Sequence, residues 1–158
     1  MKFYNYDIVF QEIPDETTLA FNISNCPCFC KGCHSPFLAE DVGTLLTEET
    51  MIPILQKYVN GLTCVAFMGG DAEVTMVNQL AKWLKMNYNL KTAWYSGREN
   101  ISELFEPQYF DYVKIGPYKP ECGPLNQPTT NQVLYKIRHN GNECFYEDIT
   151  SLFLHKKL

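Results

Sequence analysis

Residues 62–71 read Leu62-Thr63-Cys64-Val65-Ala66-Phe67-Met68-Gly69-Gly70-Asp71, an almost wholly apolar run that ends in a glycine pair. A short apolar run bounded by glycine is typical of a β-strand that is buried on both faces. The residues that follow, 73–88, carry apolar side chains at helical spacing, namely Val74, Val77, Leu80, Ala81 and Leu84. The sequence therefore predicts a β-α unit made of a buried strand, a glycine turn and an amphipathic helix.

Similar patterns flank this unit on both sides. We expect further strands at 2–10, 18–24, 91–96 and 110–115, a helix at 48–59 and a short helix at 101–105. Pro53 is compatible with the helix at 48–59 if Thr50 is its N-cap. Apolar strands that alternate with helices indicate parallel β-α units, and hence an open or partial barrel. Around Asn140-Gly141, residues 132–138 and 143–147 predict a C-terminal β-hairpin.

The length and composition predict one domain over residues 1–158. The net charge of −5 argues against nucleic acid as a partner, because a protein that binds phosphate backbones needs a basic surface. The basic run His155-Lys156-Lys157 is interpreted as a solvated terminus. No segment approaches the ~20 apolar residues of a membrane span, and the first residues do not resemble a signal peptide. We therefore expect a cytoplasmic protein that does not bind membranes.

Four cysteines fall within eight residues of the segment Asn25-Cys26-Pro27-Cys28-Phe29-Cys30-Lys31-Gly32-Cys33-His34. Cys26, Cys30 and Cys33 have the spacing C-x3-C-x2-C, which can ligate three irons of a cubane cluster and leave the fourth iron free to bind a substrate. A structural zinc site is the alternative, but zinc prefers four ligands in two separated pairs. Cys28 is interpreted as a small residue tolerated between ligands.

Polar or small residues follow each predicted parallel strand. The cysteine segment follows the strand at 18–24, Gly69-Gly70-Asp71 follows 62–68, Ser96 ends 91–96, and Lys114 lies at the end of 110–115. Binding sites in α/β proteins gather at these carboxyl ends. The glycines let a ligand approach the backbone closely. Asp71 and Glu73 could receive an ammonium group or cap the next helix, and Lys114 needs either a polar cavity or an edge position.

Taken together, these motifs resemble radical S-adenosylmethionine (SAM) enzymes, and in particular the activating proteins of anaerobic ribonucleoside-triphosphate reductase. The resemblance covers nearly the whole chain. It rests on C-x3-C-x2-C followed by His34-Ser35-Pro36, on Gly69-Gly70-Asp71, and on the stretches at 9–14, 19–24, 112–118 and 123–132. The chain departs from the wider superfamily at Gly32, where many members have an aromatic residue, at Ala72, where a proline is frequent, and at the additional Cys28.

The resemblance implies a compact, incomplete (β/α) barrel with a mostly parallel sheet. It also implies that Cys26, Cys30 and Cys33 hold a [4Fe–4S] cluster whose unique iron binds SAM. Gly69, Gly70 and Asp71 would then steady the SAM amino group, and Ser96 and Lys114 would contact its ribose or carboxylate. An electron from the cluster splits SAM into methionine and a 5′-deoxyadenosyl radical, which takes a hydrogen atom from a glycine of the reductase.

The implied partners are the large subunit of the anaerobic reductase and an electron donor such as flavodoxin or ferredoxin. Two alternatives stay open at this point. One is a radical SAM enzyme that acts on a small molecule, although the chain lacks substrate-binding extensions. The other is an iron–sulfur or zinc binding module without catalytic activity, which would bind metal and never cleave SAM.

Overall fold

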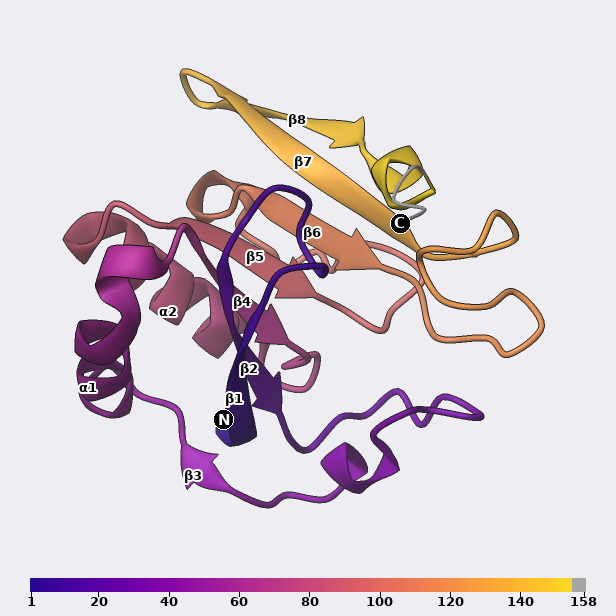
Figure 1. Cartoon of the computed structure of the whole chain (residues 1–158), viewed down its shortest axis with the longest axis horizontal. Helices are drawn as coiled ribbons and strands as arrows, with labels where there is room; N and C mark the ends of the chain where they lie inside the picture. Colours follow the sequence, from indigo (N-terminus) through magenta and orange to yellow (C-terminus); the bar gives the residue numbers. More distant parts are fainter. Residues whose placement is uncertain (155–158) are drawn as a thin grey trace.

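Four parallel strands form the centre of a single sheet in the computed structural model, which describes residues 1–154 (Figure 1). The basic run at 155–157 lies outside the described residues. In spatial order the central strands are β2 (Thr18–Ile23), β4 (Cys64–Met68), β5 (Lys91–Tyr95) and β6 (Tyr112–Ile115). Each therefore points its carboxyl end toward the same edge of the sheet.

The outer strands are antiparallel to their neighbours. β1 (Lys2–Val9) pairs with β2 and with the two-residue strand β3 (Thr44–Leu45) on one side. On the other side β7 (Val133–Asn140) pairs with β6 and with β8 (Glu143–Asp148), and the last two form the C-terminal hairpin at the top of Figure 1. The full strand order is β3-β1-β2-β4-β5-β6-β7-β8.

The expectation of a mostly parallel, incomplete (β/α) barrel is wrong. Four of the seven strand pairs in residues 1–154 are antiparallel and three are parallel, so the sheet is mixed. The same residues contain two α-helices, α1 (Glu48–Tyr58) and α2 (Val74–Asn87). A parallel pair needs a long crossover, usually a helix. After β6 the chain returns through the helix-free loop 116–132, and β7 runs antiparallel to β6.

Short 3₁₀ turns occupy several connections, namely η1 (Pro36–Ala39), η2 (Val59–Gly61), η3 (Pro107–Tyr109) and η4 (Thr150–Phe153). The predicted short helix at 101–105 is absent, and the connection from β5 to β6 contains only η3. The predicted N-cap at Thr50 is also wrong. Thr47 caps α1, because its hydroxyl accepts from the Thr50 amide while the Thr50 hydroxyl accepts from the Thr47 amide. Pro53 consequently lies inside the helix.

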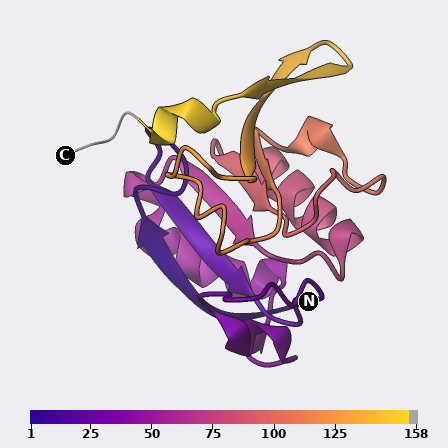
Figure 2. The ribbon, with the colours of Figure 1, turned by 90° about the vertical axis from the view of Figure 1, so that its right-hand side faces the viewer.

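Different segments of the chain pack against the two faces of the sheet. Along β4, Val65 and Phe67 belong to a core cluster that includes apolar residues of α1 and α2, whereas Cys64 and Ala66 belong to a second cluster. Because strand side chains alternate between faces, both helices cover one face. Leu125 of the loop 116–132 packs into the second cluster, and Figure 2 shows this loop in orange crossing the sheet. The predicted buried stripe of α2 is confirmed.

Among residues 1–154, no helix combines the length and apolar character needed to cross a membrane.

Candidate functional site

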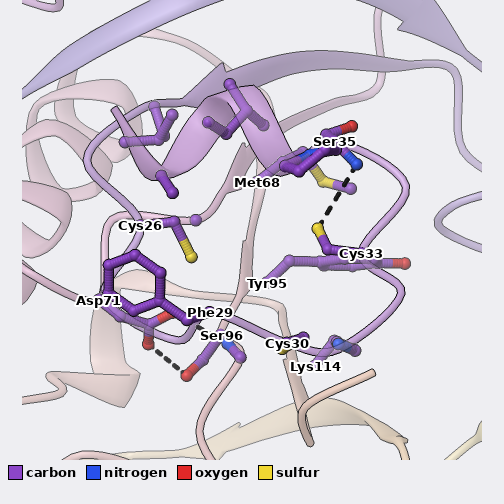
Figure 3. A pocket seen from close by; sticks show the side chains of 16 residues that line it. Cys26, Phe29, Cys30, Cys33, Ser35, Met68, Asp71, Tyr95, Ser96 and Lys114 are labelled. Carbon is purple, nitrogen blue, oxygen red and sulfur yellow. Dashed lines mark hydrogen bonds between the residues drawn. The ribbon is translucent and has the colours of Figure 1, made fainter. Parts of the chain in front are cut away.

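A cavity of about 350 Å³ lies at the carboxyl ends of the parallel strands (Figure 3). Small-molecule sites have volumes of about 300–1,000 Å³. Seven of the eight residues that the sequence singles out line this cavity, and Gly70 is the exception. The seven are Cys26, Cys30, Cys33, Gly69, Asp71, Ser96 and Lys114. They come from four separate segments of the chain, so the tertiary structure brings them together.

The cysteine segment is the loop after β2, and backbone hydrogen bonds close its base. The amides of Asn25 and Cys26 donate to the carbonyls of Glu40 and Leu38, each at 2.9 Å. Within the loop, the Cys33 amide donates to the Cys30 carbonyl at 3.1 Å, which forms a tight turn. The Ser35 amide donates to the Cys33 sulfur at 3.4 Å, as Figure 3 shows. Hydrogen bonds therefore close the loop at its base, and three of its four cysteines, Cys26, Cys30 and Cys33, line the cavity.

The loop 116–132 supports the cysteine loop from outside. The ring of His34 packs against the ring of Tyr118, with 5.0 Å between the centroids. Gly32 lies so close to this loop that a Cβ atom there would be 3.0 Å from Cγ of Pro120. The cysteine loop and the loop 116–132 are far apart in the sequence, but they pack against each other in the structure.

The three cysteines line the same cavity, but their side chains do not meet at a point. In residues 1–154, no group of three His, Cys, Asp or Glu side chains is arranged to hold a single metal ion. In a cubane cluster each cysteine bonds a different iron, so the ligands must enclose a volume. Cys26, Cys30 and Cys33 all line the same cavity, and this arrangement fits such a cluster.

Cys28 has different surroundings from the other three cysteines of the loop. Its sulfur lies 3.7 Å from Oδ2 of Asp71 and fills the space above Gly97, where a Cβ atom would approach it to 2.7 Å. Burial and the neighbouring Asp71 charge raise the pKa of the Cys28 thiol to about 12. Cys28 is absent from the cavity wall, and its thiol donates toward Asp71 instead.

Asp71 is buried at the cavity wall and accepts hydrogen bonds from the next strand end. The Ser96 hydroxyl donates to Oδ1 of Asp71, and the Gly97 amide donates to Oδ2 at 2.9 Å. Of the two roles that the sequence left open for Asp71 and Glu73, side-chain capping of α2 is not observed, and Glu73 instead receives an ammonium group. Glu73 occupies the N-cap position, but its side chain makes no capping bond and pairs with the amino group of Met1 at 3.0 Å.

Gly69 and Gly70 form the turn between β4 and α2, and both have positive φ, of 109° and 95°. The Gly69 amide donates to the Tyr95 carbonyl at 3.0 Å, and the Gly69 carbonyl accepts from the Trp94 indole at 2.9 Å. A Cβ atom on Gly70 would lie 2.6 Å from Cγ2 of Val77. The pair is therefore required by the packing of the turn, and Gly70 faces α2 rather than the cavity.

Lys114 is buried and lies in a row with the last residues of β5 and of the next strand along, β4. In register, Met68 pairs with Tyr95 and Tyr95 pairs with Lys114. The Lys114 ammonium donates to the Gly116 carbonyl at 2.8 Å and lies 5.8 Å from the centre of the Tyr95 ring. Burial lowers the pKa of Lys114 to about 8, although electrostatic interactions with Cys30, Asp71 and Cys28 oppose this shift. Lys114 is the one Lys or Arg among the described residues that line the cavity.

Sequence reasoning missed the apolar part of the wall. Besides the seven predicted residues the cavity is lined mainly by Ile23, Phe29, Pro36, Leu38, Ala39, Met68 and Tyr95. Met68 and Tyr95 are the final residues of β4 and β5. Because binding sites gather at the carboxyl ends of parallel strands, the sequence could have predicted both as site residues. Phe29 carried no such signal, because its position depends on the path of the cysteine loop.

We compared the chain with protein-family models, curated proteins and solved structures, and none of them matches it.

Proposed function

We propose that this protein is a radical SAM activase, which cleaves S-adenosylmethionine at a [4Fe–4S] cluster and generates a glycyl radical on the large subunit of anaerobic ribonucleoside-triphosphate reductase. One observation carries the proposal. The three cysteines of C-x3-C-x2-C line a single cavity whose wall also contains Asp71, Ser96 and Lys114. The proposal rests on this site and needs no closed barrel, because a function depends on its site rather than on its fold.

Cys26, Cys30 and Cys33 would hold the cluster. When bound and reduced, the cluster supplies the electron that divides SAM into methionine and the 5′-deoxyadenosyl radical. With three thiolates as protein ligands, one iron would have no cysteine ligand and would be free to bind SAM. Cys28 would take no part, since its thiol points toward Asp71.

The polar side chains of the wall have charges that suit the methionine end of SAM. The Asp71 carboxylate attracts an ammonium group, and its orientation is fixed by Ser96 and by the Gly97 amide. Lys114 would supply the positive charge for a carboxylate or a donor for a ribose hydroxyl, and within residues 1–154 its hydrogen-bond partner is the backbone carbonyl of Gly116. The Gly69 carbonyl retains a second lone pair beside its bond from Trp94.

The apolar residues of the wall would exclude water from the reacting atoms, which protects a radical from side reactions. Phe29 is 76% exposed while also lining the cavity, so it extends from the wall into solvent. An exposed aromatic at the rim suits a substrate that is itself a segment of another protein. This feature favours a protein substrate over a small molecule.

The proposal includes an electron donor such as flavodoxin or ferredoxin and a cytoplasmic location. All seven cysteines of the chain lie within residues 1–154 and are free thiols. Free thiols are typical of a reducing compartment, which a cluster of this kind also needs.

The test is anaerobic reconstitution of the protein with iron and sulfide, followed by a strong reductant and SAM. We expect 5′-deoxyadenosine as a product and an electron paramagnetic resonance signal of [4Fe–4S]⁺ that changes when SAM binds. Alanine at Cys26, Cys30 or Cys33 should abolish both signals. Cys28→Ala is the matched control within the same loop and should retain both.

Three outcomes would contradict the proposal. A protein that binds the cluster but never cleaves SAM would favour the binding-module alternative. A protein that binds zinc and no cluster would exclude the proposed iron–sulfur site. Loss of the cluster in Cys28→Ala would show that the ligand set is different. The protein substrate is tested separately, by the appearance of a glycyl radical signal when the large reductase subunit is added.

A further inference from the structure

His139 and Cys144 face one another on the C-terminal hairpin. His139 of β7 and Cys144 of β8 are register partners, so their side chains project from the same face of the sheet. The Cys144 sulfur lies 3.5 Å from Nδ1 of His139, within hydrogen-bonding distance for sulfur. In both ribbon views the hairpin is at the top and the cysteine loop near the bottom, so this pair is remote from the cavity (Figures 1 and 2).

A third group fixes the protonation of the imidazole. Nε2 of His139 lies 2.8 Å from the carbonyl oxygen of Phe110. A carbonyl oxygen only accepts hydrogen bonds, so Nε2 must carry a proton. In a neutral imidazole the other ring nitrogen is then an acceptor. The Cys144 thiol therefore donates to Nδ1.

This arrangement matches the one that activates nucleophiles in proteins. It consists of a thiol, a base within hydrogen-bonding distance, and a group that orients the base. His139 is exposed and Cys144 is partly exposed. β8 is the last strand in the sheet order, so within residues 1–154 no further strand covers its outer edge. Cys144 packs against the core cluster on one side and keeps part of its surface in solvent, so a small reagent would approach from that exposed part.

We infer that Cys144 is a modification site that undergoes thiol–disulfide exchange with a low-molecular-weight disulfide such as oxidised glutathione, with His139 as the base. The Cys144 proton passes to Nδ1 of His139, and the thiolate attacks one sulfur of the disulfide. The disulfide bond breaks, a mixed disulfide forms on Cys144, and the departing thiolate takes the proton from the imidazolium. Cys144 is oxidised and the small disulfide is reduced, so the exchange is balanced without another reactant.

Cys122 provides an internal comparison. It is also partly exposed, but within residues 1–154 its sulfur makes no hydrogen bond with an imidazole. Cys64 is buried, and burial raises the pKa of its thiol far above the ordinary value, so it should be inert.

The experiment treats the full chain anaerobically with oxidised glutathione, stops the reaction with N-ethylmaleimide and maps the modified cysteines by tryptic digestion and mass spectrometry. Cys144 falls in the peptide 139–156 and Cys122 in the peptide 115–136, and each peptide has a single cysteine. We expect glutathione to appear on Cys144 faster than on Cys122, on the order of tenfold or more.

Replacing the base separates its chemical role from a structural one. His139→Gln should lower the rate at Cys144 to that of Cys122, whereas Arg138→Lys, at the neighbouring exposed position, should leave it unchanged. Imidazole added to His139→Ala should restore the rate, which a purely structural role would not allow. Equal rates at Cys144 and Cys122 in the unaltered chain, or an unchanged rate in His139→Gln, would overturn the inference. This test is independent of SAM cleavage.

Discussion

Ser96 donates a hydrogen bond to the carboxylate of Asp71, and this contact joins the carboxyl ends of β5 and β4 at the wall of the cavity. Both side chains are buried, so neither can exchange its partner for water. The Ser96 hydroxyl also accepts from the Arg98 amide at 3.1 Å. The pair therefore fixes the start of the connection after β5 as well as the orientation of the carboxylate.

Removing the Ser96 hydroxyl should destabilise the protein. Ser96→Ala leaves a buried carboxylate oxygen without one of its donors, and we expect the free energy of unfolding to fall by about 1–3 kcal/mol. Urea denaturation monitored by circular dichroism measures this change. Ser151→Ala, at an exposed position, is the matched control and should have little effect. A Ser96→Ala protein as stable as the parent would mean that the contact carries no net energy.

Glycine at position 70 should be required by the turn. Gly70→Ala places a Cβ atom 2.6 Å from Cγ2 of Val77 at a φ of 95°, and we expect a loss of at least about 1–3 kcal/mol in the free energy of unfolding. Gly61→Ala is the control, because nothing lies within 4 Å of its added Cβ atom. That variant should be neutral or slightly stabilised. Similar stability of the two variants would contradict the steric argument.

An ion pair between buried Glu16 and exposed Lys91, at the opposite end of the parallel strands, should make stability depend on pH. Lys91 and Tyr112 both donate to Oε1 of Glu16. Burial by itself raises the pKa of Glu16, but the hydrogen bonds from Lys91, Thr63 and Tyr112 outweigh it, and the pKa is lowered overall. A lowered folded-state pKa stabilises the protein above the unfolded-state pKa, and this contribution is lost as pH falls through the folded-state value.

Glu16→Gln should therefore reduce the free energy of unfolding by about 1–3 kcal/mol at pH 7. The difference from the parent should shrink as the pH is lowered through the acidic range, because the parent carboxylate then becomes protonated too. Glu147→Gln removes the exposed partner of Arg138 and should change stability by less than about 1 kcal/mol at any pH. A Glu16→Gln difference that stays constant with pH would rule out this linkage.

Lys114 should contribute to the binding of SAM if the proposed function is correct. Lys114→Met removes the positive charge from the cavity wall, and we expect the dissociation constant of SAM to rise about tenfold in the cluster-loaded protein. Anaerobic isothermal titration calorimetry measures this constant. Lys31→Met removes an exposed lysine of the cysteine loop and serves as the control for net charge. Equal dissociation constants for the two variants would exclude a contact between Lys114 and SAM.

The local patterns of the sequence predicted most of the strands and helices correctly. The architecture that they indicated, a mostly parallel partial barrel, is wrong. The strand at 62–68 and the stripe of the helix at 73–88 appear as β4 and α2, since the period of apolar residues is a property of neighbouring positions. The barrel was wrong because the direction of a strand depends on the connection before it. The predicted helix at 101–105 and an unrecognised reversal at 116–132 both lie in connections, where periodicity gives no information.

The sequence by itself determined the spacing of Cys26, Cys30 and Cys33 and their place after a strand, because both are fixed along the chain. Only the tertiary structure decided what those residues face. In the folded protein the Cys28 thiol donates to Asp71, and Asp71 accepts a hydrogen bond from Ser96 instead of capping α2. His139 and Cys144 lie within hydrogen-bonding distance of each other. Each of these contacts joins residues far apart or on different strands. The contacts of Asp71 depend on strand order, which the packing of the whole sheet sets, whereas the His139–Cys144 pair depends on the register that the hairpin turn fixes.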